Sequence, residues 1–387
     1  MDFDVIIVGS GLVGASFALA LSETGLKLAV VEARPPLVNV ADDWDSRVYA
    51  ISPGSAAFLE RCGVWHELDS ARIGQVEEMR IFGDDSRSEL DFSAYDAGLR
   101  ELALIVENRG LQRALWHALR RQGDIEVIAP AGCKALTLAP ETAQLELDDG
   151  RELQAQLVVG ADGADSWVRA QAGIEVRARS YHQRAVVANF SAAKPHRGIA
   201  FQWFRRDGVL ALLPLPGDRV SMVWSAADEQ AERLLQLTPG ELAAQVAAAS
   251  GGVVGELRVI TPAAAFPLRV QRVAKLVQPR LALIGDAAHN VHPLAGQGVN
   301  LGFRDARELA QVLTRRAPET DNGDYHLLRR YERARREDIA SMRFATDALQ
   351  RLFGSERPWL AGLRNFGLRL TNRQAQLKNL LVQHAVG

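Results

Sequence analysis

Three glycines close to the N-terminus have the spacing of a turn that binds a dinucleotide. Gly9, Gly11 and Gly14 directly follow the apolar run Val5–Val8. Glycines have no Cβ, so a pyrophosphate can approach the free N–H groups at the start of the following helix. Glu32, at the end of the next apolar run, can accept a hydrogen bond from a ribose hydroxyl. The pattern predicts a bound dinucleotide. A flavin dinucleotide is favoured because the motif opens the chain, and a nicotinamide dinucleotide is the alternative.

Two aspartates stand beside glycines further along the chain, each after a run typical of a buried strand. The pairs are Asp162-Gly163 and Gly285-Asp286. An aspartate at the carboxyl end of a strand lies in the crevice where α/β sheets bind ligands. Its carboxylate can accept a hydrogen bond from a ribityl or ribose hydroxyl. Both pairs are therefore candidates for cofactor binding.

The stretch after Asp286 contains two histidines and a second group of glycines. His289 and His292 do not suit a metal site, because Pro293 and the glycines break any helix that would place both imidazoles on one face. No further His or Cys cluster completes a set of ligands, so we expect no metal. Residues 296–300 read Gly-Gln-Gly-Val-Asn and predict the start of a helix whose dipole suits an anionic flavin ring.

The elements that must position these residues alternate between strands and helices. Val5–Val8 predicts a strand buried on both faces, residues 15 to about 24 a helix, and residues 27–31 a second strand. This βαβ unit predicts an α/β fold with a doubly wound parallel sheet. Three further strands are predicted to return to that sheet, at residues 102–107, 157–159 and 281–284.

A second domain is predicted where the pattern changes to alternation with turn signals. Residues 76–92 and 181–267 show this pattern, typical of an antiparallel or mixed sheet inserted into the first domain. The tail is helical in pattern and rich in Arg. We therefore assign residues 1–75, 100–180 and 268–324 to the flavin-binding domain, residues 76–99 and 181–267 to a substrate domain, and residues 325–387 to a C-terminal helical region.

Composition excludes several other classes of protein. The 45 Lys and Arg residues nearly balance 47 Asp and Glu residues, so no basic surface for nucleic acid is expected. The two cysteines are too few for a disulfide framework, which favours a reducing, cytoplasmic compartment. No signal peptide and no apolar run of about 18 residues is found, so any membrane contact is expected to be peripheral.

With these motifs in this order, the sequence resembles the FAD-dependent aromatic hydroxylases of the para-hydroxybenzoate hydroxylase type. Within them it is most similar to the ubiquinone-biosynthesis hydroxylases. The resemblance is strongest over residues 292–305, and it also includes Asp45-Ser46-Arg47, residues 50–52 and Asn108-Arg109. It covers most of residues 1–345.

The resemblance implies which residues bind the cofactor. It places Arg47 and Arg109 near the flavin, Asp286 on its pyrophosphate or ribityl side, and a flavin-facing loop at His292 and Pro293 that we take as the catalytic candidate. The full set of expected FAD contacts is Gly9, Gly11, Leu12, Val13, Gly14, Glu32, Ala33, Arg34, Arg47, Arg109, Asp162, Gly163, Gly285, Asp286, Gly296, Gln297, Gly298, Val299 and Asn300.

The implied reaction is hydroxylation of an electron-rich aromatic ring. A hydride from NADH or NADPH reduces the flavin, O₂ is captured at the flavin C4a carbon as a hydroperoxide, and one oxygen atom passes to the ring. The resemblance implies that the substrate is a polyprenyl phenol or quinol of ubiquinone biosynthesis. The sequence shows no general base, which suits a reaction whose hard step belongs to the cofactor. The alternatives are a flavin oxidase or reductase of the same fold and a non-catalytic scaffold in a quinone-biosynthesis complex.

The C-terminal stretch has the pattern of a basic amphipathic helix. Such a helix can lie on the inner face of the cytoplasmic membrane, where a substrate with a long prenyl tail dissolves. Packing against the protein's own core or a partner is the alternative. The apolar positions are Trp359, Leu360, Leu363, Phe366, Leu370 and Leu377, with Arg364, Arg369, Arg373 and Lys378 between them.

Overall fold

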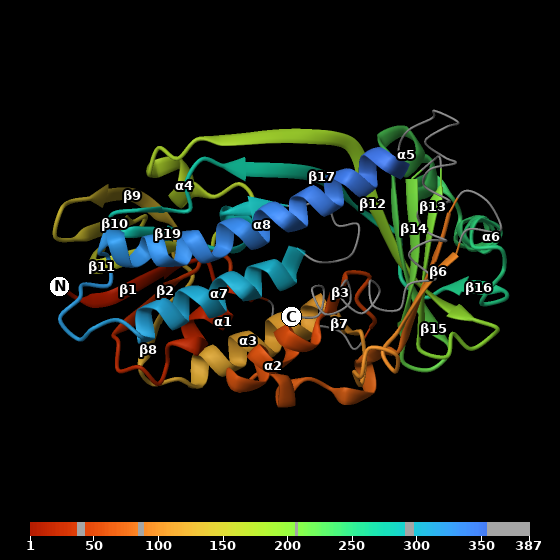
Figure 1. The fold of residues 1–387 in the computed structure, drawn as a ribbon, viewed down its shortest axis with the longest axis horizontal. Coiled ribbons are helices and arrows are strands. Elements are labelled where there is room, and N and C mark those ends of the chain that lie inside the picture. The colour runs from red at the N-terminus through yellow and green to blue at the C-terminus, as the bar shows by residue number, and fades with distance from the viewer. Residues whose placement is uncertain (37–42, 84–88, 206–207, 291–297, 354–387) are drawn as a thin grey trace.

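The molecule is elongated, with one large sheet at each end and a small sheet between them (Figure 1). The computed structural model describes all residues except 37–42, 84–88, 206–207, 291–297 and 354–387, and it describes residues 341–353 by their backbone alone. The sheets have eight, nine and three strands.

The eight-stranded sheet is the doubly wound sheet that the sequence predicts. Its strand order is β18-β19-β11-β1-β2-β8, and all neighbours from β19 to β8 are parallel. The strands β1 and β2 are apolar throughout their buried part, as expected for strands covered on both faces. The bounds are β1 Phe3–Val8, β2 Leu28–Val31, β8 Ile125–Ile128, β9 Cys133–Leu138, β10 Ala143–Leu147, β11 Glu152–Gly160, β18 Val277–Gln278 and β19 Leu281–Leu283.

One strand assignment is wrong. The strand expected at residues 102–107 exists as β7 (Ala103–Glu107), but it pairs antiparallel with β3 (Val48–Ile51) and β4 (Gly74–Val76) in the separate three-stranded sheet. The parallel position beside β2 is taken by β8, which we did not predict. A short apolar run shows that a strand is buried, but it does not show which partner the strand pairs with.

The helices that cover the parallel sheet approach it closely through glycines. A Cβ on Gly14 would lie 2.0 Å from the carbonyl oxygen of Gly9, and one on Gly302 would lie 2.5 Å from Cγ2 of Val13, so α1 packs tightly on the first turn and on α7. Helix α1 starts earlier than expected, at Leu12 rather than residue 15. The bounds are α1 Leu12–Ala20, α2 Pro53–Arg61, α3 Asn108–Arg121, α4 Trp167–Gln171 and α7 Gly298–Thr314, with 3₁₀ turns at Trp65–Glu67, Ser70–Arg72 and Gly285–Ala287.

The nine-stranded sheet has one face covered by two helices. Alternate residues such as Val186, Leu210 and Trp224 pack with α5 (Asp228–Gln236) and α6 (Pro239–Ala249) in a second core. The long strands β12 and β17 run from the parallel sheet to this one (Figure 1). The remaining bounds are β5 Glu78–Phe82, β6 Glu89–Ser93, β12 Val176–Ala192, β13 Ile199–Arg205, β14 Gly208–Leu215, β15 Arg219–Ala227, β16 Leu257–Val259, β17 Ala264–Val273 and β20 His289–Asn290.

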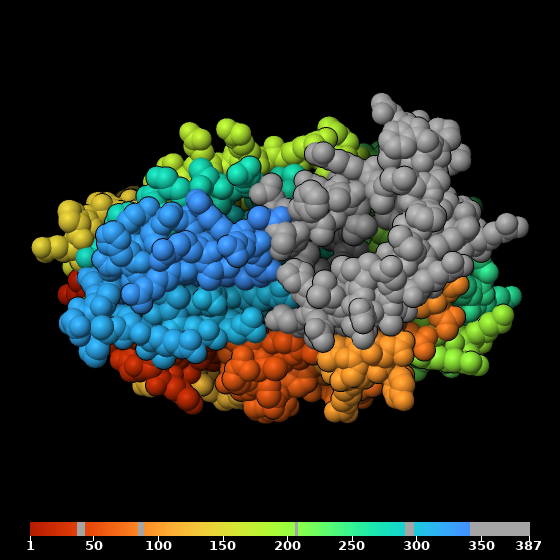
Figure 2. All heavy atoms as spheres, in the orientation of Figure 1, coloured from red at the N-terminus to blue at the C-terminus, as the bar shows by residue number. Residues whose placement is uncertain are grey.

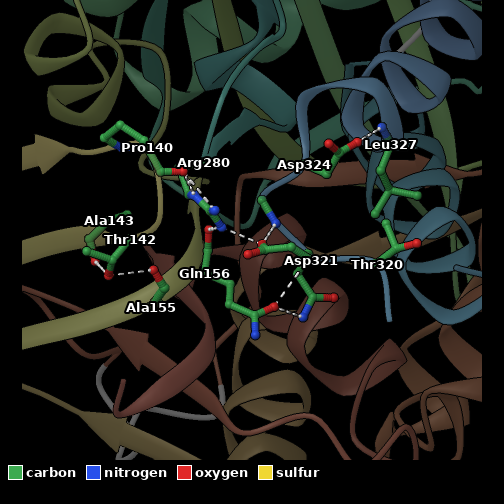
Figure 3. A network of polar contacts seen from close by, with 12 residues as sticks. Pro140, Thr142, Ala143, Ala155, Gln156, Arg280, Thr320, Asp321, Asp324 and Leu327 are labelled. Carbon is green, nitrogen blue, oxygen red and sulfur yellow. Dashed lines mark hydrogen bonds and ion pairs between the residues drawn. The ribbon is translucent and has the colours of Figure 1, made fainter. Parts of the chain in front are cut away.

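The last described helix, α8 (Tyr325–Phe353), is held at its start by a buried arginine. Nε and Nη2 of Arg280 donate to the carbonyl of Pro140, Nη1 donates to the carbonyl of Gln156, and the guanidinium also pairs with Asp321 (Figure 3). The backbone N–H of Arg280 donates to the carbonyl of Gly323. Helices α7 and α8 pack side by side, and both run across the strands of the parallel sheet in Figure 1. Figure 2 shows the residues of α7 and of the first part of α8 as one continuous stretch of surface.

The predicted domain boundaries cross these long strands. β12 and β17 each contain residues from both sides of a predicted boundary, so the domain division stays a prediction. Among the described residues, no helix is long and apolar enough to span a membrane. The helical pattern expected from residue 325 is present as α8, and the part from Trp359 onward lies outside the described residues.

Candidate functional site

The glycine turn at residues 9–14 and the pairs Asp162-Gly163 and Gly285-Asp286 lie together at the carboxyl edge of the parallel sheet. The N–H of Gly9 donates to the carbonyl of Val31, and the N–H of Ala161 donates to that of Val8. Gly9 adopts a φ of +101°, and a Cβ there would lie 2.6 Å from the carbonyl oxygen of Ala161. The Asp162 turn can therefore rest directly on the glycine turn only because residue 9 is glycine.

The start of α1 is open for an anion. Its N-cap is Gly11, which makes no side-chain capping hydrogen bond, and a Cβ on Gly11 would meet no atom within 4 Å. The first-turn N–H groups, including those of the candidate residues Val13 and Gly14, point toward this end of the helix. A helix N-terminus of this kind binds phosphate groups through N–H groups and the dipole.

Glu32 lies beside this turn at the end of β2. Its Oε2 accepts the N–H of Ser10 at 2.6 Å and the hydroxyl of Ser10 at 2.9 Å, while Oε1 accepts the N–H of Arg34 at 2.8 Å. A carboxylate has about four acceptor positions, so one stays available to a ribose hydroxyl. Ala33 and Arg34 follow it as exposed residues.

Asp162 has a local structural role in addition to its place at the site. Its Oδ1 accepts the hydroxyl of Ser166 at 2.5 Å, and Oδ2 accepts the N–H of Val168 at 2.9 Å, which caps helix α4. Its Gly163 neighbour has a φ of +86° and open space where a Cβ would stand. The side chain therefore shapes the turn, and the backbone of residues 161 and 162 lies against Gly9.

Arg169, which the candidate set omits, ties two of the motifs together. Its guanidinium is buried and donates from Nη1 to the carbonyl of Ala287 at 3.0 Å and from Nη2 to that of Ala164 at 2.9 Å. One carbonyl follows Asp286 and the other follows Gly163. The position of Arg169 shortly after Asp162-Gly163 was the available signal, since an arginine in an apolar helix needs buried acceptors.

Asp286 occupies a partly enclosed position. Its side chain is accessible to water, yet surrounding atoms desolvate it enough to raise the pKa of its carboxyl, although nearby His289 and Arg47 oppose the shift. Tyr49 lies within range of the same charges, and burial raises the pKa of its phenol, so it stays neutral. An accessible carboxylate in poorly hydrated surroundings suits the hydroxyl groups of a bound cofactor.

A buried carboxylate, Asp305, holds the turn that carries Asp286. Oδ2 accepts the N–H of Gly285 at 2.9 Å and Nε2 of His289 at 2.5 Å, and Oδ1 accepts Nε of Arg335 at 2.7 Å. Burial alone would raise the pKa of Asp305, but His289 and Arg335 outweigh it and lower the pKa. His289 is thus a hydrogen-bonded structural residue, as its poor fit to a metal site suggested.

Helix α7 begins at Gly298, as its sequence predicts. Among the described residues, no atom lies within 4 Å of a Cβ built on Gly298, so no described side chain crowds the first turn. Asn300 differs from expectation: its Nδ2 donates to the carbonyl of Ala50 and its Oδ1 accepts the N–H of Ser52, at 2.8 and 3.0 Å. Its side chain fixes α7 to β3, which leaves only its backbone, with that of Val299, for the cofactor.

Arg47 lies between the cofactor-side residues and the nine-stranded sheet. Its guanidinium carbon is 5.4 Å from the ring centre of Tyr49 and 5.2 Å from that of Phe266 on β17. Arg109 is the second residue of α3, and its Nη2 donates to the carbonyl of Asp43 at 2.8 Å. Four candidates, His292, Pro293, Gly296 and Gln297, lie outside the described residues.

The residues at this edge fit FAD. The open helix start suits a pyrophosphate, Glu32 keeps an acceptor for a ribose, and accessible Asp286 lies in a turn that Asp305 holds to α7. The dipole at the start of α7 suits an anionic ring. An FAD-dependent monooxygenase of the para-hydroxybenzoate hydroxylase type is the class of protein that this fold and site define.

Comparisons with known proteins narrow the class. A family model described as "FAD binding domain" matches residues 2–344. The chain is 36% identical to ubiquinone hydroxylase UbiL of Rhodospirillum rubrum, over 99% of this chain and 89% of the relative. It is 35% identical to 3-demethoxyubiquinol 3-hydroxylase of Escherichia coli, over 99% and 98%. The chain belongs to this family of FAD-dependent ubiquinone-biosynthesis hydroxylases.

Solved structures confirm the fold. p-Nitrophenol 4-monooxygenase PnpA of Pseudomonas putida matches with a TM-score of 0.80 at 18% identity, covering 100% of this chain and 98% of that one. PqsL of Pseudomonas aeruginosa, described as a probable FAD-dependent monooxygenase, matches with a TM-score of 0.78 at 24% identity, covering 95% and 100%. The α/β fold class and the FAD cofactor predicted from the sequence are confirmed.

Proposed function

We propose that this protein hydroxylates the aromatic ring of a polyprenylated phenol or quinol in ubiquinone biosynthesis, with O₂ and NADH or NADPH as co-substrates. One observation carries the proposal: Arg47 contacts both Tyr49 on the cofactor side and Phe266 on the nine-stranded sheet. This contact brings an apolar sheet face next to the turn that holds Asp286.

The sheet face beside Arg47 has the character of a wall for an apolar ring. Phe266 pairs in register with Ala185, and Ala264 with Val187, so these four side chains share one face. Across β12 the same face continues through Val223 and Ser225 and then through Val209 and Ala211. Small and aliphatic side chains with few polar groups suit an aromatic ring with a long apolar tail.

In this proposal, the residues of the chain bind and orient the cofactor and shield it from water. Bound FAD would supply the oxygen chemistry, and the protein would supply its position and the exclusion of water. We assign the pyrophosphate to the start of α1 and a ribose to Glu32. We assign the flavin side to Asp286, Arg47, Arg109 and the first turn of α7. Burial raises the pKa of Tyr49, so its hydroxyl stays protonated, and its ring lies beside the Arg47 guanidinium.

Oxygen isotope labelling tests the reaction. Purified protein is mixed with FAD, a short-chain prenylphenol and either NADPH or NADH, and it is supplied with ¹⁸O₂. The mass of the product is measured by mass spectrometry. One ¹⁸O atom per product with one reductant consumed supports a monooxygenase. Hydrogen peroxide with an unlabelled product supports an oxidase, and flavin that stays oxidised with every donor supports a scaffold.

The ring position that is hydroxylated can be identified from the intermediate that accumulates in a deletion strain. Quinone intermediates extracted from cells that lack this protein should include one species that lacks a ring hydroxyl, because the blocked step leaves its substrate behind. An unchanged set of intermediates would contradict a role in this pathway.

We also propose where the protein works. A ring with a long prenyl tail dissolves in the bilayer, so the enzyme must meet it at a membrane surface or receive it from a partner protein. We favour peripheral contact on the inner face of the cytoplasmic membrane through the basic C-terminal stretch, with a quinone-biosynthesis complex as the alternative.

A further inference from the structure

The short segment of residues 43–47 joins the three-stranded sheet to the nine-stranded sheet. The N–H of Asp45 donates to Oε1 of Glu107 on β7 at 2.5 Å, and the Asp45 carbonyl accepts Nδ2 of Asn189 on β12 at 2.8 Å. The Trp44 ring lies under two guanidinium groups, with Arg72 at 4.4 Å and Arg219 at 5.3 Å. The segment is therefore fixed from both sides.

The carboxylate of Asp45 contacts both arginines that we assign to the flavin. Oδ1 accepts the N–H of Arg47 at 3.0 Å, and Oδ2 accepts the N–H of Arg109 at 3.0 Å. Oδ2 also lies 3.6 Å from Nε of Arg109, and the Asp45 side chain is 13% exposed. One largely buried carboxylate thus holds the backbone of one arginine and the first turn of the helix that carries the other.

We infer that Asp45 is a positioning residue that sets Arg47 and Arg109 against the cofactor and couples both to the substrate-side sheet through Asn189. The inference rests on the proposed function only in assigning Arg47 and Arg109 to the flavin.

The chemistry of the helix start supports this role. Helix α3 begins at Asn108, and its N-cap residue, Glu107, makes no side-chain capping hydrogen bond. The N–H of Arg109 is one of the first-turn donors that have no partner within the helix. Asp45 accepts that N–H from a segment more than 60 residues earlier, so it holds α3 and the Arg47 segment in one arrangement. Without the carboxylate, both cations lose their fixed direction.

A double-mutant cycle on FAD affinity tests the inference. The dissociation constant of FAD is measured by flavin fluorescence for the wild type, Asp45→Ala, Arg109→Ala and the double variant. Melting of the apoprotein is recorded for each. The matched control is Asp149→Ala. Asp149 accepts the N–H of Arg151 two residues later at 3.0 Å, as Asp45 does that of Arg47, and it also pairs with an arginine guanidinium, but it lies on the hairpin at the opposite end of β11.

We expect Asp45→Ala to raise the FAD dissociation constant at least about tenfold, with no change for Asp149→Ala. The double variant should lose less FAD affinity than the product of the two single losses, because part of the effect of Asp45 acts through Arg109 and only the part that acts through Arg47 remains in the Arg109→Ala background. The inference would be overturned if the two single losses of FAD affinity multiplied fully in the double variant. It would also be overturned if the FAD dissociation constant of Asp45→Ala were within twofold of that of the wild type.

Asp45→Asn keeps the test informative if the alanine variant does not fold. Asparagine retains one acceptor oxygen of the same shape but cannot accept from both arginines, so an intermediate loss of FAD affinity is expected. Equal affinity to the wild type would count against the inference. The proposed function is tested separately, by ¹⁸O incorporation with the wild type. The positioning role of Asp45 and the proposed hydroxylation can therefore fail independently.

Discussion

At the scale of single residues, Asp286 combines water access with desolvation, and this combination predicts opposite effects on stability and binding. Asp286→Asn should weaken FAD affinity by about 1–3 kcal/mol, because cofactor hydroxyls lose a charged acceptor. Burial raises the pKa of this carboxyl, so its charge destabilises the folded apoprotein above that pKa. The variant should therefore melt slightly higher than the wild type at pH 7 without FAD, and this advantage should vanish as the pH falls below about 4.

Calorimetry of the apoprotein and FAD titration of the same samples check both effects. Asp218→Asn is the control, since Asp218 is an exposed carboxylate in the turn between β14 and β15. FAD affinity equal to the wild type would remove Asp286 from the cofactor site.

Gly298 gives a second prediction at this scale. No described residue lies within 4 Å of its Cβ position at the start of α7, so we expect a valine there to be accepted by the fold and to project toward the flavin. We expect Gly298→Val to lose hydroxylation while FAD still binds, because added bulk displaces the ring from the helix dipole. Steady-state turnover and flavin content measure the two effects.

Gly240→Val is the matched control, because Gly240 lies in the first turn of α6 and also has open space at its Cβ position. Unchanged turnover of Gly298→Val would show that the helix start does not face the flavin.

At the scale of elements, Asp305 connects the Asp286 turn, α7 and α8 through one buried carboxylate. Asp305→Asn should destabilise the protein by about 3 kcal/mol at pH 7, because Arg335 and His289 lose the buried anion that they share and Arg335 keeps only its ion pair with Asp338. The pKa of Asp305 is lowered in the folded state, so its stabilising effect is present above the unfolded value near 4 and is lost as the pH falls through the lower folded value.

The difference between wild type and variant should therefore shrink in acid. Urea unfolding at pH 7 and near pH 3 measures it. Glu67→Gln is the control: an ion pair with Arg121 also lowers the pKa of Glu67, but that pair is exposed and screened by water. A constant difference across this range would contradict the assignment of charge to Asp305.

Elements with a local signal could be predicted from the sequence. β1, the glycine turn and the start of α7 follow from an apolar run, glycine spacing and a change of period, and the structure has them where expected. The partner of β7 could not be predicted, because pairing with β3 and β4 depends on long-range contacts. Aspartate at positions 45 and 305 looks like any other charge in the sequence, and only the fold brings partners to it.

The sequence predicted where the site residues lie better than it predicted which groups their side chains contact. The backbone around Gly9, Asp162 and Gly285 converges because parallel strands share a carboxyl edge. The side chains of Asp162 and Asn300, however, bond to protein groups, and a sequence pattern does not show that the acceptors are already used.

At the scale of the whole molecule, the substrate's solubility raises the question of how the enzyme meets a bilayer. The C-terminal stretch carries four cations among apolar residues at helical spacing, at Arg364, Arg369, Arg373 and Lys378. Each cation near an anionic surface contributes about 1 kcal/mol, and the apolar side chains add to it by entering the headgroup region. The stretch is therefore our candidate for membrane contact.

Charge removal separates membrane contact from folding. Arg364→Gln with Arg373→Gln should lower binding to phosphatidylglycerol-containing vesicles by about 2 kcal/mol, because two surface cations are lost. Flavin content and turnover of a water-soluble phenol should stay unchanged. Arg177→Gln with Arg258→Gln, two exposed arginines elsewhere, is the matched control. Co-sedimentation at low and high salt measures the binding, which should weaken with salt. Vesicle binding equal to the wild type would exclude contact through these cations, and flavin loss or aggregation would show instead that the stretch packs on the protein itself.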